Sequence, residues 1–104
     1  MIIATSDSIE GKRIKRTIGL VRGNTVRARF VIKDIIAALR NMIGGEITEY
    51  TGLLAQAREQ AIDRMVEDAE KKGANAIVGL RLTTTSIMSA AAEILAYGTA
   101  VEIE

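Results

Sequence analysis

Apolar and polar residues alternate along two segments near the C-terminal end of the chain, residues 74–85 and 93–103. A period of two is typical of β-strands, in which successive side chains point to opposite faces of a sheet. One face of the first strand is expected to carry Ala76, Val78, Leu80 and Leu82, and the other Ile77, Gly79, Arg81 and Thr83. Between the two strands, residues 86–92 are expected to form a loop or a hairpin tip.

The second strand differs from the first because both of its faces are apolar or small. One face carries Leu95, Tyr97, Val101 and Ile103, and the other carries Ile94, Ala96, Gly98 and Ala100. A strand with two apolar faces is buried on both. One face can pack on helices, but a chain of 104 residues has little left to cover the second. This strand therefore predicts an interface between copies of the chain.

Apolar residues at helical spacing predict two helices. Residues 34–43 begin with the capping residue Asp34 and end before two glycines, which tolerate the left-handed conformation of a helix end. Residues 48–72 form the clearest pattern, and Gly73 closes it. Its apolar stripe consists of Tyr50, Leu54, Ala57, Ala61, Ile62, Met65, Val66 and Ala69. Three pairs of opposite charges predict ion pairs on its surface: Arg64–Asp68, Glu67–Lys71 and Asp68–Lys72.

The N-terminal part of the chain is expected to add two strands. The first is a short apolar run at residues 2–5. The second starts near Lys12 and alternates, with three apolar residues expected on one face: Ile14, Ile18 and Leu20. The Gly23-Asn24 pair is expected to make a turn or a bulge before the chain continues to Phe30.

Three segments in order along the chain carry a resemblance to a known family: residues 41–51, 73–79 and 93–101, which read NMIGGEITEYT, GANAIVG and EILAYGTAV. On these motifs the chain resembles the YbjQ-like family over nearly its whole length. Together with the predicted elements, the resemblance implies a small α/β (α+β) fold in one domain, residues 1–104, with two helices packed on a β-sheet. It also implies assembly into a ring-shaped homopentamer. Members of the family are often labelled "putative heavy-metal-binding", and the resemblance carries no catalytic residues over.

Composition and charge narrow the classes of function. There are 14 Lys and Arg residues and 13 Asp and Glu residues, so the net charge of +1 favours neither nucleic acid nor an anionic membrane as a partner. The N-terminus lacks the pattern of a signal peptide, and no apolar run approaches the ~20 residues that cross a membrane. We therefore expect a cytoplasmic protein. The basic stretch from Lys12 to Arg29 is interpreted as protection of a strand edge, because Phe30 is the only aromatic residue near it for stacking on bases.

The chain offers few ligands for soft or borderline metals, because it contains neither Cys nor His. Met42 and Met65 lie on apolar helical stripes and are interpreted as core residues. Glu46 and Glu49 are candidates for a hard cation, since five copies around an axis could gather five carboxylates. The alternative is that these acids favour the positive end of the helix that follows them. We therefore predict no metal and no cofactor.

No catalytic residue is expected, because a Ser or Thr nucleophile would lack a His base and paired acids such as Asp63 and Glu67 lie on a polar helix face. Four residues with polar tips and apolar bodies are candidates for a small-molecule pocket between subunits: Tyr50, Arg58, Glu93 and Tyr97. Alternatively, these groups satisfy one another as buried polar residues. The sequence thus predicts a non-enzymatic, homo-oligomeric binding or structural module. A carboxylate metal-binding protein and an enzyme with a pocket between subunits are the alternatives.

Overall fold

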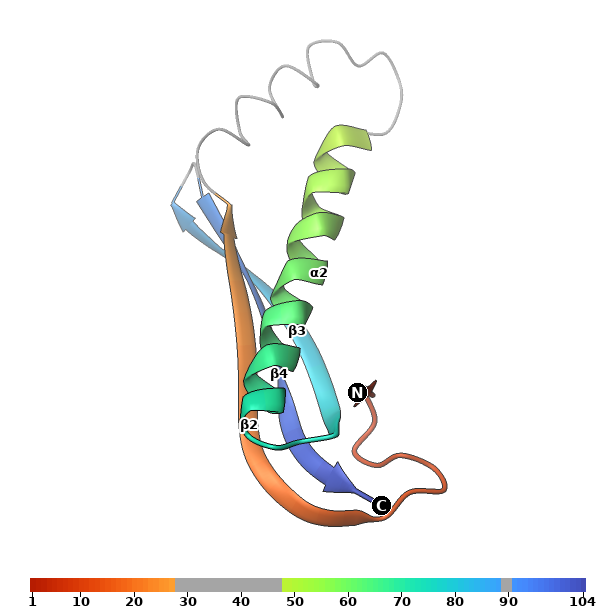
Figure 1. Ribbon diagram of the computed structural model, residues 1–104. Helices are drawn as coiled ribbons and strands as arrows, with labels where there is room; N and C mark the ends of the chain where they lie inside the picture. Colours follow the sequence, from red (N-terminus) through yellow and green to blue (C-terminus); the bar gives the residue numbers. More distant parts are fainter. Residues whose placement is uncertain (28–47, 89–90) are drawn as a thin grey trace.

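The computed structural model describes residues 1–27, 48–88 and 91–104, which form four strands and one helix (Figure 1). The elements in chain order are β1 (Ile2–Ile3), β2 (Ile14–Arg27), α2 (Thr48–Lys71), β3 (Ala76–Met88) and β4 (Ala91–Ile103). The helix predicted at residues 34–43 lies outside the described residues, as does Phe30. The described part of the chain therefore shows one helix on a sheet, and the other helix stays a prediction.

The four described strands form one sheet in the order β1-β3-β4-β2. β4 is antiparallel to both of its neighbours, and β1 pairs with β3 in parallel over two residues. Figure 1 shows β2, in orange, running alongside β4, while α2 crosses one face of the sheet. The predicted hairpin between β3 and β4 is present, but its strands reach further than expected, to Met88 and from Ala91. The strand with two apolar faces thus occupies the middle of the sheet.

α2 packs its predicted apolar stripe on the sheet. Four residues of the stripe are fully buried: Ala57, Ala61, Met65 and Ala69. The predicted polar face is exposed at Gln56, Glu59, Gln60, Asp63, Glu67 and Glu70. The helix ends at Lys71, one residue before the predicted end, and Gly73 stops it as predicted, with φ of 84°. The N–H groups of Gly73 and Ala74 close the last turn through bonds of 3.0 Å. Within the described residues, no helix is long and apolar enough to cross a bilayer.

Helix and sheet approach each other most closely at Gly23 of β2. A Cβ atom built there would lie 2.3 Å from the carbonyl oxygen of Ala61 and 2.3 Å from the backbone nitrogen of Met65. Backbone atoms in a packed helix cannot move aside, so glycine is required at this contact. The prediction of a turn or bulge at the Gly23-Asn24 pair is wrong, because β2 remains paired with β4 through both residues.

β2 has one residue more than β4 in two places, near Lys15 and near Ile18. Each such bulge reverses the alternation of faces that follows it. Ile18 consequently packs on the cluster under α2, Ile14 packs on the opposite face, and Leu20 is 60% exposed. The prediction that these three residues share one face is wrong, because the period-two pattern assumes an uninterrupted ladder.

β3 also changes face, at a bulge between Val78 and Arg81. Gly79 adopts a left-handed conformation there, with φ of 64°, which glycine tolerates without strain. Val78 lies in the cluster on the side away from α2, whereas Leu80 packs on the cluster under α2. The predicted alternation is right before the bulge and wrong beyond it.

β4 is buried on both faces along part of its length, as its sequence predicts. Toward α2, three of its residues belong to the main core: Ile94, Ala96 and Ala100. On the other face, a smaller cluster contains Ala76, Val78, Val101 and Ile103. Ile9 and Ile14 cover this cluster, and the N-terminal segment is held there by a hydrogen bond of 2.8 Å from Ala4 N–H to the Ile77 carbonyl. This cover lies near the chain termini, and the same face is more open further along β4 (Figure 1).

Candidate functional site

The uncovered part of the sheet, on the side away from α2, collects several exposed apolar side chains. We call it the open face and define it by Leu20, Arg22, Asn24, Val26, Arg81, Thr83, Thr85, Glu93, Leu95 and Tyr97. The registers of the three strands place these residues on one side. Leu20 is 60% exposed, Val26 49% and Tyr97 37%. Large apolar side chains exposed on one face of a sheet are candidates for a site of interaction.

Tyr97 lies between two arginines on the open face. Its register partners are Arg22 on β2 and Arg81 on β3, so the three residues form a row across the sheet. The Arg81 guanidinium donates hydrogen bonds to the carbonyl oxygens of Thr5 and Leu80, both at 2.8 Å. The Arg22 side chain is exposed. A row of one tyrosine and two arginines has the composition of an interface centre, where Tyr and Arg are enriched.

Glu93, the second predicted site residue on this face, is engaged within the chain. Its carboxylate accepts a hydrogen bond of 3.1 Å from the side-chain amide of Asn24. The backbone carbonyl of Asn24 accepts a second one, of 2.5 Å, from the guanidinium of Arg64. This polar network links β4, β2 and α2 and orders one end of the open face.

The predicted site residues do not gather at one place in a single chain. Glu93 and Tyr97 share the open face, whereas Arg58 is exposed on α2, which covers the opposite side of the sheet. Three further candidates have side chains outside the described residues: Glu46, Glu49 and Tyr50. A site that combined Arg58 with Tyr97 would therefore need more than one copy of the chain.

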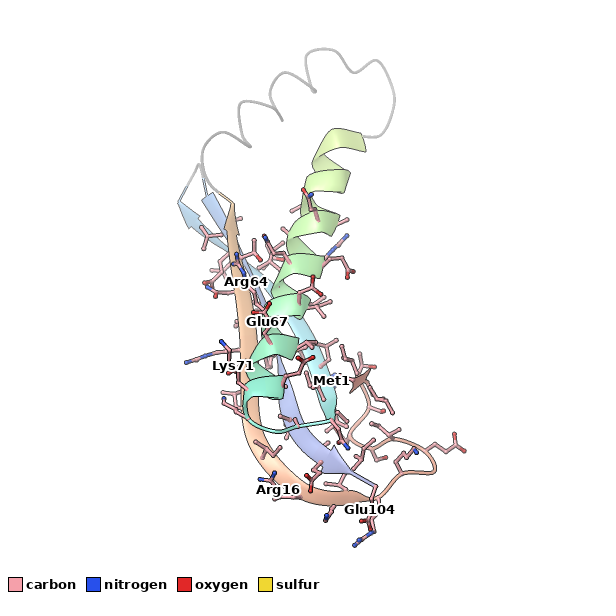
Figure 2. All side chains as sticks on the ribbon, viewed as in Figure 1. Met1, Arg16, Arg64, Glu67, Lys71 and Glu104 are labelled. Atoms are coloured by element: carbon pink, nitrogen blue, oxygen red, sulfur yellow. The ribbon has the colours of Figure 1, made fainter. Side chains whose placement is uncertain are left out.

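One edge of the sheet carries an arrangement that the sequence patterns did not predict. β2 is an edge strand, and side chains from successive turns of α2 bind its outward backbone groups. Lys72 donates to the Leu20 carbonyl at 3.3 Å, Asp68 accepts from the Arg22 N–H at 3.3 Å, and Arg64 donates to the Asn24 carbonyl at 2.5 Å. We call this arrangement the capped edge. Figure 2 labels Arg64 where α2 passes beside β2.

The spacing of the capped edge explains how it forms. Four residues advance a helix by roughly 6 Å, and two residues advance a strand by about 6.8 Å. Helix positions four apart therefore match strand positions two apart. Of the three ion pairs predicted along α2, whose residues are all described, only Asp68–Lys72 forms, at 3.3 Å. The i, i+4, i+8 run of polar residues was visible in the sequence, but its partner strand was not.

The basic N-terminal stretch is partly neutralised by acids at the end of β4. Arg13 forms an ion pair with Glu104, and Glu102 pairs with Lys15 at 3.7 Å and with Arg16 at 3.9 Å. Figure 2 labels Arg16 and Glu104 at this end of the molecule. Exposed pairs of this kind add little stability. They do lower the local positive charge that would attract a polyanion.

The described residues do not provide a heavy-metal site. Within residues 1–27, 48–88 and 91–104, no group of three or more His, Cys, Asp or Glu could hold an ion. The whole chain lacks Cys and His, and the thioether of Met65 is fully buried in the core, as predicted. The donor atoms of the described part therefore do not fit a soft or borderline metal.

One helix on a four-stranded sheet, in the part of the chain that the structure describes, defines a small α+β module with an open apolar face. A family model described as "Putative heavy-metal-binding" matches residues 1–104, and the chain belongs to this family, the YbjQ family. The resemblance drawn from the three sequence motifs is thereby confirmed.

Similar proteins extend over the full length of the chain. A UPF0145 protein of Methanosarcina acetivorans is 58% identical over 103 residues, which cover 99% of this chain and 97% of that protein. A UPF0145 protein of Clostridioides difficile is 56% identical over 104 residues, covering 100% and 93% of the two chains. A crystal structure of a Pediococcus pentosaceus protein of unknown function, from the DUF74 family, shares the fold with a TM-score of 0.65 at 18% identity, covering 100% of this chain and 98% of that one. None of these names states an activity.

Proposed function

We propose that the protein is a homo-oligomeric binding or structural module without a catalytic reaction of its own, and that its copies associate through the open face. The observation that carries this proposal is the exposure of Leu20, Val26 and Tyr97 on the face of the sheet opposite to the one that carries α2. The row of Arg22, Tyr97 and Arg81 supports it, because such residues commonly dominate the binding energy of interfaces.

The exposed apolar surfaces of one copy differ from one another, which favours a ring over a two-fold dimer. Besides the open face, the chain exposes Leu82 to 44% on the side of the sheet that carries α2. Met1, Ile2 and Ile3 are 45%, 43% and 37% exposed near the β1 edge. Contacts between unlike surfaces generate closed rings or filaments, whereas a two-fold contact uses one surface twice. We take the size of the ring, five copies, from the family resemblance.

Light scattering at micromolar concentration tests the association. The expected mass is five times that of the 11.2 kDa chain. A monomer would contradict the proposal as a whole. Another closed oligomer would correct the ring size and leave the association standing.

Leu20→Asp tests the open face itself. The substitution places a charge in an apolar interface, and we expect it to dissociate the assembly by at least tenfold in the association constant, which corresponds to about 1.4 kcal/mol. The chain should still fold, because Leu20 is 60% exposed within one copy. Gln56→Asp is the matched control, since it adds the same charge on the exposed polar face of α2. An unchanged mass for both variants would remove the open face as the interface.

A carboxylate metal site is the second candidate, and the description of the family favours it. Glu46 and Glu49 from several copies would supply oxygen ligands around a ring axis, which suit a hard cation. Equilibrium dialysis with zinc, copper, cadmium and magnesium tests this site, and stoichiometric binding that Glu49→Gln abolishes would establish it. Native mass spectrometry of freshly purified protein separates it from a small-molecule pocket, because a copurified metal and a copurified organic molecule differ in mass.

A further inference from the structure

The N-terminal segment of the chain contributes few buried side chains to the fold. We call residues 1–10 the strap. All ten are described, none is buried, and only Ala4 and Ile9 are half-buried. β1, which lies within the strap, pairs with β3 over two residues. Segments with few buried apolar contacts open at a lower free energy than the core does.

The bulge of β3 receives the strap. Gly79 and Leu80 have no register partner in β4, and their N–H groups bind the strap instead. Gly79 donates to the Ser6 carbonyl at 2.8 Å, and Leu80 donates to the Ala4 carbonyl at 3.1 Å. The pairing of β4 with β2 and β3 involves no residue of the strap. The long strands can therefore keep their hydrogen bonds when the strap leaves.

A glycine lies where the strap joins the rest of the chain. Lys12 donates to the Ile9 carbonyl at 3.0 Å and closes a turn there, in which Gly11 has a φ of 77° and open space around its Cα. Directly after this turn, Arg13 and Glu104 exchange two backbone hydrogen bonds, of 3.4 and 3.1 Å. They fix the chain that leads into β2 to the residue that follows β4. Gly11 can thus act as a hinge, because glycine changes its backbone angles at little cost.

The strap covers one end of the sheet on the side away from α2. The smaller cluster lies there, with Ile9 of the strap and Ile14 of β2 packed on it. Val101 of this cluster lies on the same face of β4 as Tyr97 of the open face, since the two are four residues apart in a regular strand. Removal of the strap would therefore join the smaller cluster to the open face.

We propose that the strap opens as one unit about Gly11 while α2 and the three long strands stay folded. Opening extends the open face along β4 by the smaller cluster, so the strap controls how much apolar surface this side of the sheet presents. The closed form is favoured because it covers apolar side chains and satisfies two N–H groups of the bulge. The inference concerns a single copy and does not depend on the proposed association.

Amide hydrogen exchange with single-residue resolution tests the proposal on the natural chain. Ala4, Gly79 and Leu80 donate their N–H groups across the contact between strap and sheet, so one opening should expose all three with the same opening constant. We expect this constant to be at least about 100-fold larger than that of Met65 in the core of α2. Three different constants would overturn opening as a unit. A constant equal to that of Met65 would overturn opening as a separate event.

Asp68→Ala separates strap opening from unfolding of the whole chain. The substitution removes contacts between α2 and β2, which stay folded when the strap opens. We expect the opening constant of Met65 to rise by about fivefold and those of Ala4, Gly79 and Leu80 to stay unchanged. The same rise at all four N–H groups would mean that the strap opens only together with the rest of the fold.

Thiol labelling gives an independent readout, because the chain contains no Cys. Val78→Cys places a thiol in the smaller cluster, and Val21→Cys is the matched control under α2, with the two valines 5% and 0% exposed. Cysteine is a small apolar residue, so both variants should keep the circular dichroism spectrum of the natural chain. We expect an aromatic disulfide reagent to label Val78→Cys at least about tenfold faster. Equal rates would count against the proposal, and if either variant fails to fold, the exchange experiment on the natural chain decides.

Discussion

The two edges of the sheet handle their unpaired backbone groups in different ways. At the capped edge, Arg64, Asp68 and Lys72 of α2 bind three successive outward groups of β2. At the other edge, formed by β1 and by the part of β3 that continues past it to Met88, no described side chain binds the backbone groups of Leu82 and Thr84. The helix thus covers one face of the sheet and closes one edge, and the surfaces it leaves are those through which we propose that copies meet.

The difference between the edges originates in where α2 lies. Gly23 lets the helix backbone come so close to β2 that even a single Cβ atom would not fit. This proximity brings the side chains on one flank of the helix within reach of the β2 edge. The same displacement toward β2 leaves Leu82 of β3 44% exposed. The contact at Gly23 therefore shapes both edges of the sheet. Substitutions at this contact and near it should separate its effects on stability from those on association.

The largest effect is expected for Gly23→Ala. The added Cβ atom would lie 2.3 Å from backbone atoms of Ala61 and Met65, so α2 has to shift away from β2. We expect the free energy of unfolding to fall by about 3 kcal/mol or more, with loss of the capped edge. Urea denaturation at one fixed protein concentration measures it. Gly11→Ala is the control, because a Cβ atom added at Gly11 would have no other atom within 4 Å and only the φ of +77° opposes the change, at a cost of about 1 kcal/mol. Equal losses for the two variants would refute the close-approach explanation.

A smaller effect is expected for Asp68→Ala. Its carboxylate accepts from the Arg22 N–H and pairs with Lys72, both at 3.3 Å. Because water can replace these bonds at the surface, we expect a loss of about 1 kcal/mol and no change in the oligomeric mass. Glu67→Ala, on the exposed polar face of α2, is the control and should change stability by less than about 0.5 kcal/mol. A drop in mass for Asp68→Ala would mean that the capped edge also takes part in association.

The smallest effect, an increase in stability, is expected for Thr25→Val on the side of β2 that faces α2. Thr25 is 2% exposed, and its hydroxyl has no hydrogen-bond partner among the described residues. A methyl group in its place removes a buried polar atom, so the free energy of unfolding should rise by up to about 1 kcal/mol. Thr17→Val, at an exposed position of the same strand, is the control with no expected gain. Destabilisation by Thr25→Val would reveal a partner for this hydroxyl.

Local sequence patterns determined the elements and much of the core. The apolar stripe and Gly73 predicted α2, since helical spacing and a glycine stop depend on neighbours in sequence. The two apolar faces of β4 predicted a strand in the middle of a sheet, and three ordered motifs predicted the family. Glu93 and Tyr97 were singled out because their polar tips stand out in an otherwise apolar strand; the structure places both on the open face, and their role in a site stays a prediction.

Only the tertiary structure decided which surfaces are covered. The bulges near Lys15, near Ile18 and at Gly79 reverse the faces of their strands, and an extra residue becomes visible only when the partner strand is known. Gly23 reads as a turn signal in the sequence, but packing against α2 gives it its role. The capped edge joins residues about 40 to 50 positions apart, such as the pair Asp68 and Arg22 with a separation of 46. No local pattern encodes such a contact, because it depends on where the helix lies across the sheet.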